Sequence, residues 1–204
     1  MVDDKKLLVD CMTFDVSPEQ LNESMKEHNG KLIVSGVLQR ADAKNQNGRI
    51  YPREILAREA KKYSTVQIKE RRALGELDHP DSSVVNLNNV SHNIREMNWE
   101  GDDLVGTVEV LSTPAGNILK ELFKSGIKLG ISSRGLGSVE PVNEDGSDTV
   151  AVQGDFELIA FDFVSNPSTH GAFMYPMNES TGGKNELPKY YKVTKIINDI
   201  IAGE

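Results

Sequence analysis

The pattern of apolar and polar residues predicts a core made mostly of β-strands. Residues 31–39 are apolar and β-branched enough for a strand, and turn residues rich in Asn and Gly follow them. Residues 90–99 and 104–111 flank an acidic turn that contains glycine, which predicts a hairpin. Residues 149–153 and 156–164 are expected to form two more strands. The sequence therefore favours a sheet-rich fold with few helices.

Helical periodicity and helix-end signals add three helices before residue 126. Ser17 and Pro18 are typical of a helix start, and Pro52 can open a helix that runs to about Tyr63. The clearest helix has Thr113 as its N-cap and Pro114 as its first residue, and Gly126 suits its end. The apolar stripe of this helix consists of Ile118, Leu119, Leu122 and Phe123.

The two ends of the chain differ in character from its middle. We interpret residues 1–30 as an N-terminal appendage, 31–176 as the core domain, and 177–204 as a polar linker with a C-terminal amphipathic helix. With 204 residues, 38% of them apolar, the chain is long enough to bury one sizeable core. The apolar stripe of the tail can dock on its own core or on a partner, so a homo-oligomer remains open.

Charge and cysteine usage exclude several classes of protein. The formal net charge of −8 and pI near 5.1 would repel a phosphate backbone, so we expect no direct binding to nucleic acid. One cysteine, Cys11, allows no disulfide within the chain, and the first residues lack the apolar core of a secretion signal, which together indicate a cytoplasmic setting. No apolar run is long enough to cross a bilayer, so we expect no membrane protein.

A histidine in the segment Gly-Glu-Leu-Asp-His-Pro at 75–80 is the first candidate for chemistry. Pro80 restricts the backbone of His79 to an extended conformation. His79 can be a general base or a structural residue, and this segment alone does not decide between them. His170 is a reserve candidate, whereas His28 and His92 are expected to be surface or strand-face residues.

The segment Gly-Ile-Ser-Ser-Arg-Gly-Leu-Gly-Ser at 130–138 is the second candidate, because glycine weakens a strand and needs a reason there. Strand alternation places Ser132 opposite the apolar row that precedes it. The backbone amides from Ser133 to Gly135 can serve as oxyanion donors, and Arg134 can anchor the segment or add positive potential. The alternative is a glycine-rich bulge with incidental serines.

An acid among the apolar residues of the strand at 156–164 is the third candidate. Strand alternation places Asp162 on one face with Phe156, Leu158, Ala160 and Val164, so an acid interrupts an apolar row. A buried carboxylate needs hydrogen bonds or a cation, and a histidine able to become charged would suffice. The alternative is that the opposite face of the strand is buried.

Taken together, these three segments resemble the prohead core protein proteases of T4-like phages. The segment Asn-Gly-Arg-Ile-Tyr-Pro at 47–52 and the residues from Asp162 to Ser168 are similar too, and the resemblance spans roughly 31–175. It implies an α+β fold like that of herpesvirus assemblin, a mostly antiparallel β-barrel flanked by helices. It also implies a serine endopeptidase without a cofactor or metal, acting inside the phage prohead in the host cytoplasm on scaffold, core and major capsid proteins.

The resemblance also implies roles for individual residues. Ser132 would be the nucleophile, with Ser133 as its rival, and His79 the general base. Asp162 would be the third residue of the triad, with Asp155 and Glu76 as competitors.

Proteases of this kind cut after glutamate that follows an apolar residue two positions earlier, with a small residue next. This chain has two such sequences, one at Glu23 and Ser24 and one at Glu179 and Ser180. We therefore expect self-processing at one or both of them.

Two other classes of function remain to be distinguished. The chain can be an inactive scaffold or shell component that keeps the protease fold. It can also be a metal hydrolase built from Asp78, His79 and His92, although these residues lack the compact spacing of zinc motifs.

Overall fold

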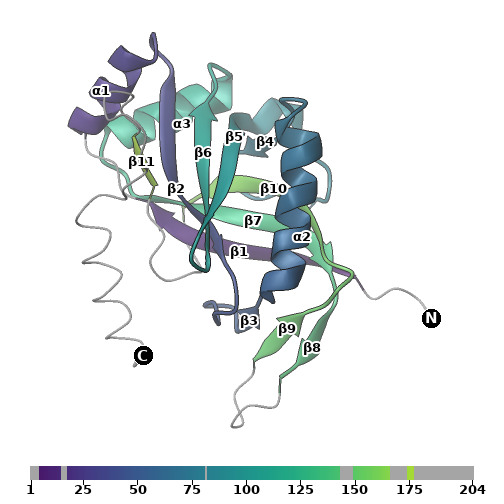
Figure 1. Cartoon of the computed structure of the whole chain (residues 1–204). Helices are drawn as coiled ribbons and strands as arrows, with labels where there is room; N and C mark the ends of the chain where they lie inside the picture. The colour runs from purple at the N-terminus through teal and green to yellow at the C-terminus, as the bar shows by residue number, and fades with distance from the viewer. Residues whose placement is uncertain (1–4, 15–17, 81, 143–148, 166–173, 177–204) are drawn as a thin grey trace.

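The computed structural model describes residues 5–14, 18–80, 82–142, 149–165 and 174–176. Within them, most of the strands belong to two antiparallel sheets, which lie across one another with helices at the sides (Figure 1). A third, smaller sheet lies at one end. These sheets confirm an α+β fold, mostly antiparallel with few helices. The strand pairings of the described residues do not close into one barrel, so the barrel that the resemblance implied stays a prediction.

The larger sheet has the strand order β11-β2-β6-β5-β4. Its centre is the hairpin of β5 (Val90–Glu100) and β6 (Asp103–Val110), as the sequence predicts. On one side of this hairpin lie β2 (Leu32–Arg40) and β11 (Met174–Pro176), and on the other side lies β4 (Leu74–Glu76).

The second sheet has β7 (Leu129–Gly137) between β1 (Lys6–Phe14) and β10 (Glu157–Val164), all antiparallel. A parallel bridge from Leu77 to Phe163 joins the end of β4 to β10, so the two sheets meet there. The candidate residues of the three motifs gather at this junction. The third sheet consists of β3 (Arg49–Ile50), β9 (Val150–Val152) and β8 (Val139–Pro141), in that order.

Helix ends follow the signals in the sequence. Helix α1 spans Pro18–Glu27, α2 spans Arg53–Tyr63 and α3 spans Pro114–Lys124. The hydroxyl of Thr113 accepts a hydrogen bond from the backbone N–H of Gly116 at 3.0 Å, which is the predicted cap, and Gly126 has the positive φ of 71° that a helix stop needs. A π-helical turn, η1 (Ser64–Ile68), continues α2, and a 3-10 turn, η2 (Leu87–Asn89), precedes β5.

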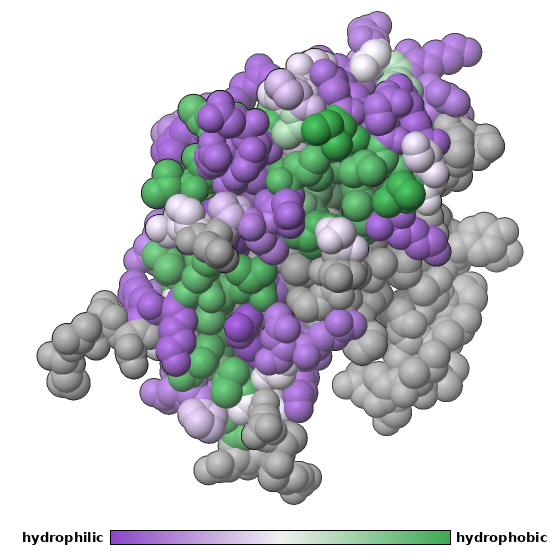
Figure 2. Space-filling view, turned by 180° about the vertical axis from the view of Figure 1, so that it is seen from behind, coloured by the Kyte–Doolittle hydropathy of each residue, from purple (hydrophilic) through white to green (hydrophobic). Residues whose placement is uncertain are grey.

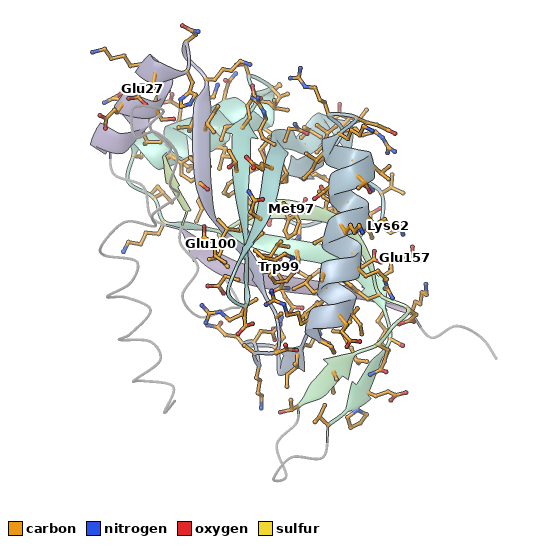
Figure 3. All side chains as sticks on the ribbon, in the orientation of Figure 1. Glu27, Lys62, Met97, Trp99, Glu100 and Glu157 are labelled. Atoms are coloured by element: carbon orange, nitrogen blue, oxygen red, sulfur yellow. The ribbon has the colours of Figure 1, made fainter. Side chains whose placement is uncertain are left out.

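The core lies between the sheets and under the helices. Figure 3 shows Met97 and Trp99 of β5 in the region beside α2, where the guanidinium of Arg53 lies 4.3 Å from the centre of the Trp99 ring. Figure 2 shows the rear of the molecule, with apolar surface among the polar side chains. Ile118, on the outer side of α3, is 55% exposed, whereas its neighbour Leu119 is fully buried.

The segment 1–30, interpreted from the sequence as an appendage, contributes β1 and α1 to the described structure. Leu8 of β1 and Leu21 of α1 are buried in the hydrophobic core. The expected linker and tail at 177–204 lie outside the described residues. The division into three parts therefore stays a prediction, with the qualification that β1 and α1 pack against the central sheets.

Leu119 and Ile118 allow a test of which face of α3 is packed. Leu119→Ala is expected to lower the free energy of unfolding by about 3 kcal/mol, because it leaves a cavity in the core. Ile118→Ala, on the exposed side of the same helix, is expected to change it by less than about 0.5 kcal/mol. Urea unfolding followed by circular dichroism measures both, and equal losses would contradict the packing described.

Candidate active site

The carboxylate of Asp162 is the centre of the site. It is fully buried on β10, and each of its oxygens accepts two hydrogen bonds. Oδ1 accepts from the backbone N–H of Glu76 at 2.9 Å and from Nη2 of Arg134 at 3.2 Å. Oδ2 accepts from Nε of Arg134 at 2.8 Å and lies 3.1 Å from Nδ1 of His79. The expectation that this acid needs a cationic partner is thus met by an arginine as well as by the histidine.

These contacts keep the Asp162 carboxylate ionised. Burial by itself raises its pKa, since a charge is less stable away from water. The hydrogen bond from His79, the charge of Arg134 and the backbone N–H of Glu76 outweigh burial, and the pKa of Asp162 lies below its ordinary value. Asp162 is therefore an anion that can orient and stabilise a charged imidazole.

The backbone around His79 turns its ring towards Asp162. Asp78 has a positive φ of 71°, a conformation that aspartate tolerates better than most residues, and its N–H donates to the carbonyl of Phe163 at 2.7 Å. Its carboxylate accepts from the N–H of His79 at 3.0 Å. Because the carboxylate of Asp162 only accepts, the His79 nitrogen facing it, Nδ1, carries a proton. In the neutral ring Nε2 is then the basic nitrogen.

Close packing of β4 against β10 explains why the histidine motif begins with glycine, at Gly75. A Cβ placed there would lie 2.0 Å from the carbonyl oxygen of Phe161 and 2.2 Å from Nε2 of His92. Only glycine lets β4 approach β10 this closely, and this approach brings the motif to Asp162.

Ser132 lies directly opposite Asp162 in the pairing of β7 with β10. Side chains at paired positions point to the same face of a sheet, with Cβ atoms about 5 Å apart. The hydroxyl of Ser132 is 3.4 Å from the carbonyl oxygen of Ser133, longer than an ordinary O–H···O bond, so this contact holds it weakly. Ser132 and His79 therefore both neighbour one carboxylate. Ser132 is fully buried.

The guanidinium of Arg134 connects all three motifs. It lies two residues after Ser132 on the same face of β7 and is fully buried. Besides Asp162, it binds Oε1 of Glu76 at 3.0 Å and the carbonyl of Ser82 at 2.7 Å. The sequence suggested either an anchor or a source of positive potential at this position, and the side chain has the contacts of an anchor.

The backbone amides of Ser133 and Gly135 were expected to serve an oxyanion, and the side-chain positions of both residues have neighbours of their own. The hydroxyl of Ser133 accepts from Nε2 of Gln39 at 2.8 Å. A Cβ at Gly135 would lie 2.4 Å from the ring of Phe156, which is a packing reason for this glycine. Both residues lie in β7, which pairs with β1 on one edge and β10 on the other.

The remaining predicted residues have distinct surroundings. Glu76 binds Arg134 and also the backbone N–H of Asn86 at 3.0 Å. Asp155, the other competing acid, accepts from the hydroxyl and the N–H of Ser138, each at 3.0 Å. Glu23 lies in α1, and the next residue, Ser24, is fully buried and donates to the carbonyl of Ile33 at 2.9 Å. The second cleavage sequence, at Glu179 and Ser180, and the reserve candidate His170 lie outside the described residues.

His92 has a structural environment. Its Nδ1 is 2.8 Å from the hydroxyl of Ser91 and its Nε2 is 2.8 Å from the carbonyl of Phe161. Burial lowers the pKa of His92 to about 4, so the ring is neutral near pH 7. The described residues contain no group of three His, Cys, Asp or Glu side chains placed to hold a metal ion. Within the same residues, no helix is long and apolar enough to span a membrane.

A second buried polar cluster, centred on Asp10, was missed by sequence reasoning. Asp10 lies opposite Ser133 in the pairing of β1 with β7 and is fully buried. Its carboxylate accepts from Arg49 at 3.0 Å, from Asn47 at 2.7 Å and from the hydroxyl of Tyr51. Burial and the neighbouring carboxylate raise the pKa of Tyr51 well above its ordinary value. The sequence predicted a turn and a helix start around 47–52 but no partner for its side chains, and these contacts give the segment a role in holding β1.

Comparison with known proteins places this arrangement in a family. The family model for prohead core protein serine proteases matches residues 10–182. The prohead core protein protease of Enterobacteria phage T4 is 32% identical over 161 residues, which cover 74% of this chain and 75% of that protein. The structure of the bacteriophage T4 capsid assembly protease, gp21, matches with a TM-score of 0.68 and 26% identity, over 81% of this chain and all of that one.

The match to the family model extends beyond the core assumed from the sequence, because it begins within β1. It includes the three segments that meet at Asp162. The chain belongs to the prohead core protein serine protease family, whose members are proteases of phage capsid maturation.

Proposed function

We propose that this chain is a serine endopeptidase in which Ser132 is the nucleophile, His79 the general base and Asp162 the residue that orients the base. One observation supports this most strongly. The carboxylate that binds Nδ1 of His79 belongs to the residue directly opposite Ser132 on the neighbouring strand. Ser132 and His79, which come from distant segments of the chain, thereby share one neighbour.

The reaction would be acyl transfer in two stages. Nε2 of His79 takes the proton of the Ser132 hydroxyl as its oxygen attacks the scissile carbonyl, and Asp162 stabilises the imidazolium that forms. The imidazolium then gives this proton to the leaving amine, and the C–N bond breaks. Water attacks the resulting ester with His79 again as base, which releases the acid and restores the serine.

Stabilisation of the oxyanion is assigned to the backbone amides from Ser133 to Gly135. These residues lie in a strand with partners on both edges, so an amide that serves the oxyanion has to leave its strand partner first. The complete burial of Ser132 leads to the same requirement, because a peptide carbonyl cannot reach a covered hydroxyl. We therefore assign the described conformation to a precursor that opens before it cleaves substrate.

The substrates proposed are the scaffold, core and major capsid proteins of the prohead, cut after glutamate. The two sequences Leu-Asn-Glu-Ser and Met-Asn-Glu-Ser in this chain fit that specificity, and they make the chain a substrate of its own activity. The place of action would be the interior of the prohead in the bacterial cytoplasm. An inactive scaffold or shell component with the same fold is the alternative, and the pairing of His79 with an ionised acid favours the enzyme.

Removal of the nucleophile or of the base is the direct test. Ser132→Ala and His79→Ala are each expected to lower kcat by about four to six orders of magnitude, because the proton transfer and the acyl-enzyme are lost. Cleavage of a peptide containing Leu-Asn-Glu-Ser, followed by mass spectrometry, measures this. Ser138→Ala is the matched control. It removes a hydroxyl from the same motif, but this hydroxyl binds Asp155 and is not expected to take part in the reaction.

A fluorophosphonate label distinguishes the enzyme from the inactive alternative. Only a serine activated by a base is expected to react, so the adduct should appear on Ser132 and be lost in His79→Ala. Near-normal cleavage by Ser132→Ala, or an adduct on Ser133, would contradict the assignment of the nucleophile.

Self-processing at Glu23 is expected to be limited by the fold around it. Proteases bind extended peptides, whereas this bond lies in α1 and Ser24 makes two hydrogen bonds to the backbone of Ile33. Ser24→Ala removes both bonds, keeps a small residue after the glutamate, and should speed cleavage after Glu23. Intact-mass measurement over time tests this, with Ser180→Ala as the control. Equal rates in the parent and Ser24→Ala would show that α1 does not limit the reaction.

A further inference from the structure

The buried cluster around Asp162 contains one carboxylate that the proposed mechanism does not use. Glu76 is fully buried, and its Oε1 makes all of the hydrogen bonds described for the side chain, to Arg134 and to the N–H of Asn86. Its Oε2 is buried with no hydrogen-bond partner among the described residues. A glutamine could supply the same accepting oxygen without a buried charge, so hydrogen bonding alone does not explain a carboxylate here.

Charge balance supplies the missing explanation. Arg134 is a permanent cation that binds the same oxygen of Asp162 that faces His79, and by itself it would cancel the charge available to the imidazole. Glu76 binds the other side of the same guanidinium at 3.0 Å. The two carboxylates and the guanidinium together carry one net negative charge, which remains to stabilise a protonated His79.

We infer that Arg134 and Glu76 are positioning residues of the protease, which act on His79 through Asp162. Arg134 fixes the orientation of the Asp162 carboxylate with a two-pronged contact, and Glu76 offsets the charge of Arg134. This inference rests on the proposed function for its catalytic meaning, but the effect on His79 exists in the folded protein whether or not it cleaves peptides.

Other charged or titratable groups near the cluster do not supply this charge. Tyr63 of α2 is close enough for the charges of Asp162 and Arg134 to act on its hydroxyl, but burial raises the pKa of Tyr63 well above the ordinary value, so it is neutral. His92 of β5 is neutral because burial lowers its pKa to about 4. Asp78, on the segment of His79 itself, is exposed and binds the backbone N–H of His79, so water screens its charge from the buried cluster. Glu76 is therefore the group whose charge the test has to change.

The test is the titration of His79 followed by NMR of its ring carbon in a Ser132→Ala background, in which self-cleavage is suppressed. Glu76→Gln keeps the accepting oxygen but removes one negative charge, so the protonated ring becomes less stable. Its midpoint is expected to move to lower pH by about one unit. In the enzyme with Ser132 present, the acidic limb of the kcat/KM profile should move in the same direction.

Two further variants keep the test decisive. Glu109→Gln is the matched control, because Glu109 is a buried carboxylate of β6 that binds Lys31 and Arg95, and it should leave the His79 midpoint unchanged. Glu76→Asp keeps the charge and should stay within about 0.3 unit of the parent. An unchanged midpoint in Glu76→Gln, or a shift of a full unit in Glu76→Asp, would overturn the inference about charge.

Arg134→Lys separates orientation from charge. Lysine keeps the positive charge but lacks the planar fork that holds both oxygens of Asp162. We expect kcat to fall about 100-fold, with the His79 midpoint changed by less than about 0.3 unit. Full turnover in Arg134→Lys would overturn its role. A moved midpoint in Glu76→Gln combined with normal cleavage by Ser132→Ala would refute the proposed nucleophile while leaving the charge relation intact.

Discussion

The contact between the guanidinium of Arg134 and the carboxylate of Asp162 is the interaction on which the rest of the site depends. Both side chains are fully buried, and each lies on a different strand of the same sheet. This pair makes further hydrogen bonds with Glu76, the last residue of β4, and with His79 and the carbonyl of Ser82, which follow β4 in the chain. One ion pair thus joins three distant parts of the chain where the two sheets meet.

Burying such a pair is costly, and the cost explains the number of hydrogen bonds around it. Taking two charges out of water costs several kcal/mol per ion unless other groups replace the lost water, so an incomplete cluster would be unstable. Asp162 has four donors, and Arg134 donates through each of its three nitrogens. The requirement to satisfy these charges holds the side chains in nearly one arrangement, which is also what orienting a general base needs. Stability of the core and geometry of the site therefore have the same origin.

Much of this could be predicted from the sequence where the signal is local. The cap and stop of α3 and the turn between β5 and β6 depend on residues that are adjacent in the sequence, and the structure has them where expected. The need of Asp162 for a cationic partner also followed from strand alternation and burial. The same alternation could have predicted Arg134 as that partner, because Arg134 lies two positions after Ser132 and shares its face of the strand.

What the sequence did not reveal depends on contacts between distant residues. The strand β1 lies in a segment of mixed composition, and its pairing with β7 is stabilised by Asp10 with Arg49 and Tyr51, about forty positions away. Closure into a barrel was implied only by resemblance. It depends on which sheet edges meet, and the periodicity of a sequence does not encode this.

The burial of Ser132 and the tight cluster behind it suggest how the protein separates two tasks. In the proposed mechanism, His79 is oriented by contacts that are complete within the folded core. Exposure of the Ser132 hydroxyl and release of the oxyanion donors would require neighbouring backbone to move. Movement that broke the contacts of Asp162 would leave buried charges without partners. Such movement would be far more costly than movement of the edge strand β1 alone. Activation is therefore expected to leave the base and its acid in place and to act on the segments that cover the serine.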